Sequence, residues 1–187
     1  MSYFMPEQPK EAAKVPWFDD VTTEGGWQGQ ATSKSIDTLR AEITACIGRL
    51  GGLASGFQRG SFNIDGQTRD GYQIHYAIEN KTGKMLPGRL DIAALPVKPR
   101  QQRRNSVYEQ RREQSLKMAL YMIRVALDGM WFLQQLSPGY APLMPWMLAV
   151  GKRTVTQLWA ESSVMGNLLP PGETEFIEGE IVSEKKR

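Results

Sequence analysis

The side chains in this chain that could do chemistry are mainly arginines, and they cluster in one segment. Residues 98–117, called the basic segment below, hold seven Lys or Arg and two Glu, a net charge of +5, whereas the whole chain carries only +3. The ends are acidic, because residues 1–34 sum to −2 and residues 161–187 to −3. A basic segment of this kind attracts phosphate, and acidic ends can compete for it.

The basic segment runs into a predicted helix. Asn105 and Ser106 are good N-caps, and apolar residues then recur at helical spacing to about Leu136. Arginines at a helix N-terminus oppose the helix dipole, so helix stability does not explain them. We expect their partner to be an anion outside the helix or a carboxylate of a partner protein.

Three short strands are predicted before that helix. Residues 72–79 alternate between apolar and polar, which indicates a strand with one buried face. Segments 57–64 and 84–95 flank it, and the short turns predict an antiparallel meander. Residues expected on the buried face of the flanking strands are Phe62, Ile64, Leu90, Ile92 and Ala94.

The opposite face of the meander is predicted to be polar. An aromatic residue beside two arginines and a histidine could stack on and neutralise a nucleic-acid strand, although a solvated sheet face would have the same composition. A bulge at Gly60 would switch the parity of Phe57. The residues assigned to this face by alternation are Phe57, Arg59, Asn63, Gln73, His75, Arg89 and Asp91.

The remaining pattern completes an α+β fold in the order α-β-β-β-α-α. A helix is expected at 35–50 and a last one at 142–161, folded back on the long helix, so that 35–161 forms one domain. No apolar run approaches a membrane span, no secretory signal is visible, and the single Cys46 suits a reducing compartment. We therefore expect a cytoplasmic protein.

Both tails, 1–34 and 162–187, are predicted to be flexible and to dock on partners. Trp17 and Phe18 stand in an aromatic, Pro-containing stretch, and Phe176 and Ile177 lie among glutamates. The alternatives are that Trp17 and Phe18 fold back onto the domain, and that the acidic C-terminal tail only solubilises the protein.

Catalytic and metal-binding motifs are largely missing. One His and one Cys exclude zinc sites built from these residues, and neither a P-loop nor a Rossmann fingerprint is present. We predict no cofactor, no metal and no enzymatic activity. The one competing hypothesis is a Mg²⁺-dependent nuclease, in which Asp65 or Asp70 would share a metal with Glu79 beside Lys81. These residues, Glu79 apart, also suit ordinary turns.

The arrangement of strands and helices resembles that of two families. Double-stranded-RNA-binding domains share the α-β-β-β-α order, but their Gly-rich, lysine-dense junction is replaced here by Pro96-Val-Lys-Pro-Arg-Gln-Gln-Arg-Arg104, and the helix after it is longer. Residues 57–136 also resemble the β-β-β-α core of phage single-strand annealing proteins of the RecT and Red-beta kind. That resemblance implies a DNA groove lined by basic residues of the sheet and helix.

The leading hypothesis is therefore a nucleic-acid-binding protein, with single strands favoured, that acts in DNA annealing during recombination or replication of a phage or mobile element. Self-association through the apolar 116–160 region is expected. Predicted phosphate contacts are Arg59, Lys84, Arg89, Arg100, Arg103, Arg104, Arg111 and Arg112, with Phe57 or Tyr108 stacking on bases.

The rival hypothesis is a structural or adaptor subunit of a larger complex, which docks through its tails. In that case, carboxylates of a neighbouring protein would pair with the arginines. Phosphate binding would instead leave the arginines unpaired in the isolated protein.

Overall fold

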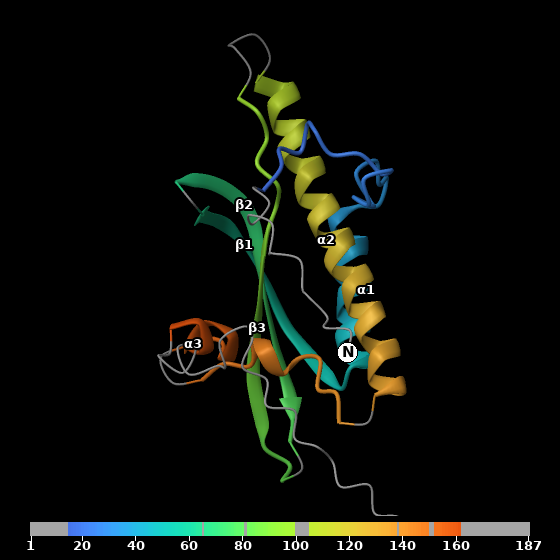
Figure 1. Cartoon of the computed structure of the whole chain (residues 1–187), viewed down its shortest axis with the longest axis vertical. Helices are drawn as coiled ribbons and strands as arrows, with labels where there is room; N and C mark the ends of the chain where they lie inside the picture. The colour runs from blue at the N-terminus through green and yellow to red at the C-terminus, as the bar shows by residue number, and fades with distance from the viewer. Residues whose placement is uncertain are drawn as a thin grey trace, which may run out of the picture.

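Two long helices cover one face of an antiparallel sheet in the described part of the computed structural model, which comprises residues 15–64, 66–80, 82–99, 105–137, 139–149 and 152–161 (Figure 1). The mixed α+β class predicted from the sequence is thus confirmed. In chain order the elements are α1 (Ile36–Arg49), β1 (Gly52–Ile64), β2 (Gln67–Glu79), β3 (Met85–Ala93), α2 (Asn105–Leu136), the short 3₁₀ helix η1 (Met144–Trp146) and α3 (Val155–Glu161).

The local signals in the sequence account for both long helices. Ser35 caps α1, and its hydroxyl accepts a hydrogen bond from the Thr38 backbone amide at 3.1 Å. Leu39, Ile43 and Ile47 follow at helical spacing and are fully buried against the sheet and α2. The second helix begins at Asn105 and ends at Leu136, as its apolar period predicts.

The strand order is β1-β2-β3, and side chains of β2 with even numbers face the helices. Tyr72, Ile74 and Tyr76 are all nearly or fully buried there. Across the sheet, Leu90 pairs with Ile74, which places the even residues of β3 on the same face.

The predicted faces of the first strand are wrong. Phe57 pairs with Ile74 and Arg59 with Tyr72, so both side chains lie on the helix-facing side, while Phe62 pairs with Arg69 on the other. The bulge lies between Ala54 and Gly56 rather than at Gly60. The second half of β1 is largely exposed, because its hairpin with β2 projects away from the helices (Figure 1), so apolar residues there do not mark the buried face.

The outer face of β2 and β3 is as predicted. Gln73 pairs with Asp91 and His75 with Arg89, so these four polar side chains share the face that α1 and α2 leave open. Asn63, which was also assigned to this face, instead lies with Phe57 and Arg59.

The single helix predicted over 142–161 is wrong. Met147 forms a bridge with Gly88, the Leu148 amide donates to the Pro87 carbonyl at 2.8 Å, and Lys152 has a φ of 59°. Met147 and Leu148 therefore pair with the edge of β3, and Leu148 also forms a bridge with Thr154 just before α3 begins. Pro145 near the start of this stretch and a left-handed residue inside it interrupt a continuous helix, although the apolar residues recur at helical spacing.

Tyr76 connects the sheet to this last region. Its side chain is 1% exposed, and its hydroxyl donates to the Leu143 carbonyl at 2.9 Å. Gly88, its partner on β3, leaves the space that the phenol ring occupies, since a Cβ there would lie 2.2 Å from the Cζ atom of Tyr76.

Burial raises the pKa of the Tyr76 phenol well above its usual value. The folded state therefore keeps this proton to a higher pH than the unfolded chain does. The resulting stabilisation is complete below about pH 10, and above that pH the free energy of unfolding declines by up to about 1.4 kcal/mol per pH unit. We expect Tyr76→Phe to reduce the loss of stability between about pH 9 and pH 11 in urea unfolding. Tyr140→Phe, at an exposed tyrosine, is the matched control and should leave the slope unchanged.

None of the helices in the described ranges combines the length and the hydropathy needed to cross a membrane.

Candidate functional site

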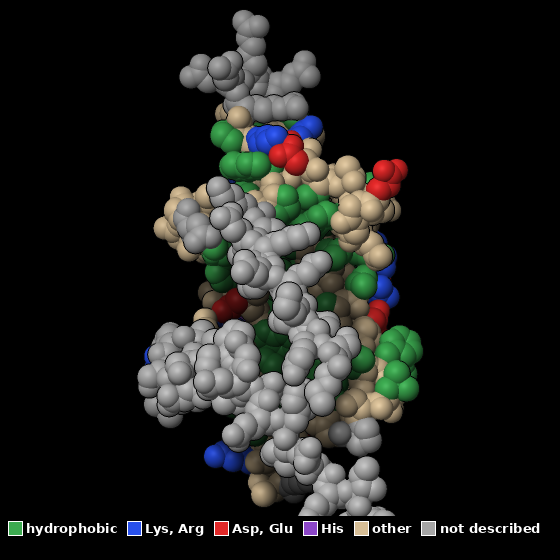
Figure 2. Space-filling model, viewed as in Figure 1, with side chains coloured by type: hydrophobic (Ala, Val, Ile, Leu, Met, Phe, Trp, Pro, Cys, Tyr) green, Lys and Arg blue, Asp and Glu red, His purple; other side chains and the backbone are tan. Residues whose placement is uncertain are grey.

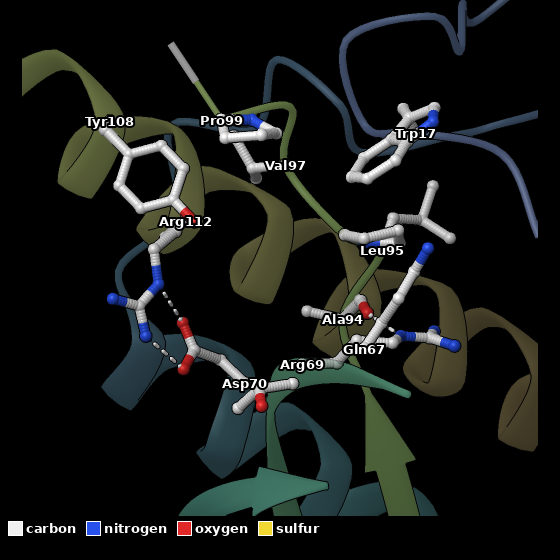
Figure 3. Close-up of a pocket in the computed structure, with 12 residues that line it drawn as sticks. Trp17, Gln67, Arg69, Asp70, Ala94, Leu95, Val97, Pro99, Tyr108 and Arg112 are labelled. Atoms are coloured by element: carbon white, nitrogen blue, oxygen red, sulfur yellow. Dashed lines mark hydrogen bonds and ion pairs between the residues drawn. The ribbon is translucent and has the colours of Figure 1, made fainter. Parts of the chain in front are cut away.

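A cleft of about 210 Å³ lies where the first turns of α2 meet the start of β2 and the chain that follows β3 (Figure 3). Trp17 and Tyr108 form opposite walls, with Leu95, Val97 and Pro99 between them. We call it the aromatic cleft. These walls come from three distant parts of the sequence, and separate contacts hold each in place.

A carboxylate–guanidinium pair closes one side of the aromatic cleft (Figure 3). Arg112 donates from Nε and Nη2 to the two oxygens of Asp70, at 2.8 and 2.6 Å, and from Nη1 to Glu109 at 3.1 Å. The hydrogen bonds to Asp70 raise the pKa of Arg112 beyond its usual value, although partial desolvation opposes them. The guanidinium also lies 5.8 Å from the ring centre of Tyr108. The pair therefore joins α2 to β2 and contributes no net charge to the cleft.

Backbone contacts fix the wall that follows β3. Arg69 is 9% exposed and donates from Nε to the Ala94 carbonyl at 2.6 Å. Ser115, fully buried on α2, donates from its hydroxyl to the Leu95 carbonyl at 2.8 Å. Both donors bind backbone carbonyls of this wall, so they hold it in position.

The N-terminal segment supplies the Trp17 wall. Phe18 is 6% exposed and packs with Leu95, Val97 and Met118, while its amide donates to the Pro96 carbonyl at 2.9 Å. Described residues 15–34 are therefore part of the fold, and the flexibility predicted for this part of the tail is wrong, while docking of Trp17 and Phe18 on a partner stays a prediction. The alternative, in which Phe18 folds back onto the domain, is the one observed.

Ion pairs tie the same segment to the basic segment. Asp19 pairs with Arg111 and accepts a hydrogen bond from the Lys98 amide at 2.9 Å, and Asp20 pairs with the Lys98 ammonium at 2.5 Å. Asp19 is only 12% exposed. Part of the positive charge in the basic segment is thus already neutralised by the chain itself.

The predicted phosphate contacts separate into paired, exposed and undescribed residues. Arg59 pairs with Glu113 at 3.2 Å, and Arg89 with Asp91 at 2.8 Å, in addition to the pairs of Arg111 and Arg112. Lys84 is exposed, but it lies in the β2–β3 turn, at the end of the sheet away from the aromatic cleft. Residues of the prediction that lie outside the described ranges are Arg100, Arg103, Arg104, Phe176 and Ile177.

Of the two predicted stacking residues, only Tyr108 lies in the aromatic cleft. Phe57 packs against the main core, with the Arg40 guanidinium 5.0 Å from its ring centre. Trp17, which we assigned to partner docking, is the second aromatic wall. The sequence analysis missed that carboxylates of the chain itself pair with the basic segment. One pattern in the sequence pointed to them: Asp19, Asp20 and Asp70 lie outside the basic segment, so they can fold onto it and neutralise its charge.

A magnesium site shared by Asp70 and Glu79 is ruled out. These two residues are nine positions apart in one continuous strand, so their side chains lie on opposite faces of the sheet. Asp65 lies outside the described residues. Among the described residues, no group of three His, Cys, Asp or Glu side chains could hold a metal ion.

The lining of the aromatic cleft offers the contacts that a flat ring requires. It offers two aromatic walls, apolar contacts from Leu95 and Val97, and polar atoms at Asp70 and Thr68. Its volume of about 210 Å³ is below the roughly 300–1,000 Å³ of most small-molecule sites. Comparison with protein-family models, with curated proteins and with solved structures finds nothing that matches this chain.

Proposed function

We propose that the protein is a non-catalytic nucleic-acid-binding protein that holds a single strand, with one base in the aromatic cleft and the neighbouring phosphates on arginines of the basic segment. The observation that supports the proposal is the aromatic cleft itself. Its Pro99 wall leads directly into residues 100–104, which hold three arginines and no acid. Stacking walls beside a cationic stretch are the two parts that single-strand binding requires.

A single strand fits this arrangement better than a duplex. A base can enter a cleft of this size only when it is unstacked and unpaired, and aromatic side chains accept any base because every base has a π face. The protein would therefore bind with weak sequence preference and strong salt dependence.

The internal ion pairs narrow the set of phosphate contacts. Arg112 already uses three of its nitrogens on carboxylates, and Arg59 and Arg111 each have a carboxylate partner. Breaking such pairs to reach a phosphate would offset much of the gain in binding. We therefore assign the phosphate contacts to Arg100, Arg103 and Arg104.

The resemblance to phage annealing proteins extends the proposal to pairing of complementary strands in recombination or replication, in the cytoplasm. Annealing of two complementary oligonucleotides, followed by fluorescence quenching, would test this extension. Competition between oligo-dT and oligo-U would show which sugar the protein prefers.

We expect the full-length protein to bind labelled oligo-dT in fluorescence anisotropy, more tightly at low salt than at high salt. Arg103→Ala with Arg104→Ala removes two phosphate contacts and should reduce the slope of log K against log salt by about 1.4. Trp17→Ala or Tyr108→Ala should cost about 1–3 kcal/mol of binding free energy, with less change in slope.

The charge-matched control is Arg59→Ala with Arg89→Ala, two arginines that have carboxylate partners and do not line the aromatic cleft. It should leave the salt slope close to that of the wild type. Equal losses in both double variants would show nonspecific attraction by net charge. Absence of binding by the folded protein at low salt would exclude the proposal.

The ion pairs within the chain count against part of both hypotheses. Arg59, Arg89, Arg111 and Arg112 have carboxylate partners of their own, whereas phosphate binding required them to be unpaired and the subunit hypothesis required carboxylates of a neighbouring protein. A subunit of a larger complex therefore remains the second candidate only through contacts that these arginines do not make.

A further inference from the structure

An apolar groove lies at the end of the molecule opposite the aromatic cleft. It has a volume of about 420 Å³ and lies between the last turns of α2, the end of β2, the start of β3 and the start of α3. Its apolar lining includes Ile78, Leu86, Met144, Leu148 and Val155. The volume is within the roughly 300–1,000 Å³ of most ligand sites, so the groove can enclose large side chains of a bound segment.

The lining of the apolar groove favours an apolar occupant. No charged residue is among those that line it, and its polar side chains are the uncharged Asn80 and Gln134. Met144 and Val155 are 60% and 36% exposed, so nothing in the described part of the chain covers them completely. Removing this apolar surface from water is favourable, provided that the occupant brings apolar side chains and buries no charge.

The chain continues from the edge of this groove. Val155, the first residue of α3, lines the groove, α3 ends at Glu161, and residues 162–187 follow. Residues 173–182, called the C-terminal motif below, contain four Glu and no Lys or Arg. The apolar residues of the motif are Phe176, Ile177, Ile181 and Val182. The C-terminal motif therefore combines apolar side chains, which the groove can bury, with carboxylates, which have to stay outside it.

We propose that the apolar groove binds the C-terminal motif of its own chain, with Phe176 and Ile177 inside the groove. The chain between them is long enough. The seven residues of α3 span only about 10 Å, whereas the 15 positions from Glu161 to Phe176 reach up to about 50 Å when extended. Phe176 therefore reaches the groove whichever way α3 points.

The covalent connection also favours this occupant over a second copy or another protein. A short tether holds a segment near its site at an effective concentration in the millimolar range. A motif with a dissociation constant of only about 100 µM as a separate peptide would thus occupy the groove of its own chain about nine-tenths of the time. A second copy at micromolar concentration would have to bind roughly a thousand-fold more tightly to compete.

The charges around the apolar groove complement those of the C-terminal motif. Lys84 is exposed and adjoins the lining, because its amide donates to Oδ1 of Asn80 at 2.9 Å. Lys152 and Arg153, just before α3, are also basic and exposed. In Figure 2, which has the viewpoint of Figure 1, Lys or Arg side chains are visible at the lower end, near the β2–β3 turn and α3. Glu79 has an odd number in β2, so its side chain lies on the sheet face that the helices leave open.

This inference goes beyond the proposed nucleic-acid function and does not rest on it. The aromatic cleft uses Asp70 near the start of β2 and the apolar groove uses Ile78 near its end, and roughly 25 Å along the strand separates them. Failure to bind oligo-dT would leave the docking of the C-terminal motif intact, and an unoccupied groove would leave oligo-dT binding intact.

The test places a spin label beside the C-terminal motif and observes the groove by NMR. In the full-length protein with ¹³C-methyl methionine, a nitroxide attached through Ser183→Cys should broaden the methyl signals of Met144 and Met147, which line the groove. Met118, buried in the small core with Phe18, should keep its signal. The native Cys46 is 3% exposed, and wild-type protein treated with the same reagent shows that it does not react.

Two variants that carry the same label identify the anchors. Phe176→Ala with Ile177→Ala should weaken docking by at least about 30-fold and restore both methyl signals, because each side chain loses its apolar burial. The matched control is Thr174→Ala with Asn167→Ala, which shortens two polar side chains of the same C-terminal stretch and should leave the broadening unchanged.

A mixed sample, with the spin label on one chain and the ¹³C-methyl groups on another, separates the two possible copies. We expect no broadening in it. Broadening there would place the C-terminal motif in the groove of another copy and would overturn the proposal. Unchanged methyl signals when one chain carries both labels would overturn it as well, and so would broadening that persists after the substitutions at Phe176 and Ile177.

Discussion

Replacing Gly88 by alanine is expected to destabilise the protein by about 3 kcal/mol and to lower the melting temperature by roughly 10 °C. The added Cβ would lie 2.2 Å from Cζ of Tyr76 and 2.5 Å from its hydroxyl oxygen. The ring cannot move aside cheaply, because it is 1% exposed and its hydroxyl is bonded to the Leu143 carbonyl. Displacing the Tyr76 ring would lose its packing in the core, and it would also break the hydrogen bond that ties the 141–148 segment to the sheet. Urea unfolding followed by circular dichroism measures the change.

Gly60→Ala is the matched control for this prediction. Gly60 also lies in a strand, but a Cβ there meets nothing within 4 Å. Alanine restricts the unfolded chain more than glycine does, so this variant should gain about 0.5 kcal/mol. A Gly88→Ala protein as stable as the Gly60→Ala protein would show that Tyr76 can repack without cost. The packing of Tyr76 against the chain at Leu143 would then be less rigid than the structure indicates.

The sequence predicted those elements whose local pattern agrees with their tertiary surroundings. Residues 72–79 alternate because β2 is the central strand and one of its faces is buried along most of its length. The long helix was predicted from Asn105 to about Leu136 because its apolar period continues to its last turns. In β2 and in α2 as far as Leu127 the apolar period coincides with burial, whereas the apolar residues of the last α2 turn are exposed.

The errors arose where tertiary contacts outweigh the local pattern. Phe62 is apolar but lies on the outer face, where its ring covers Gly71, 2.4 Å from the position of a Cβ there. The stretch 142–161 has helical apolar spacing, yet its amides pair with β3 and with each other. The prolines, the Gly25-Gly26 pair and the lack of periodicity in 1–34 suggested disorder, whereas Phe18 is part of a small core. None of these contacts is visible in a window of sequence.

The candidate site was only partly predictable for a related reason. Sequence patterns show where charge is concentrated, but they do not show which opposite charge folds onto it. Asp70 is distant from Arg112 in the sequence, and only the position of α2 against the start of β2 brings them together. The expected partner was therefore placed outside the chain, although the chain supplies it.

The ion pair of Asp70 with Arg112 gives the second large prediction, because it decides whether Arg112 is structural or a phosphate contact. Asp70→Asn and Arg112→Met are each expected to cost about 2 kcal/mol of unfolding free energy, since each leaves a partly buried charge without its partner. The side chains are 15% and 38% exposed, so the figure is set below that of a fully buried pair. The double variant should cost less than the sum of the two, with a coupling of about 1.5 kcal/mol in urea unfolding.

The exposed pair of Arg59 with Glu113 provides the control cycle. Its side chains are 54% and 39% exposed, and one ion-pair contact of 3.2 Å joins them. The effects of Arg59→Met and Glu113→Gln on the free energy of unfolding should therefore couple by about 0.5 kcal/mol or less. Equal coupling in the two cycles would argue against a structural role for the Arg112 pair.

The same Arg112→Met protein, studied at a temperature where it is fully folded, should bind oligo-dT with the salt slope of the wild type. If the slope instead falls by about 0.7, Arg112 contacts a phosphate. The phosphate would then either displace Asp70 or accept from the N–H groups that the guanidinium does not donate to Asp70.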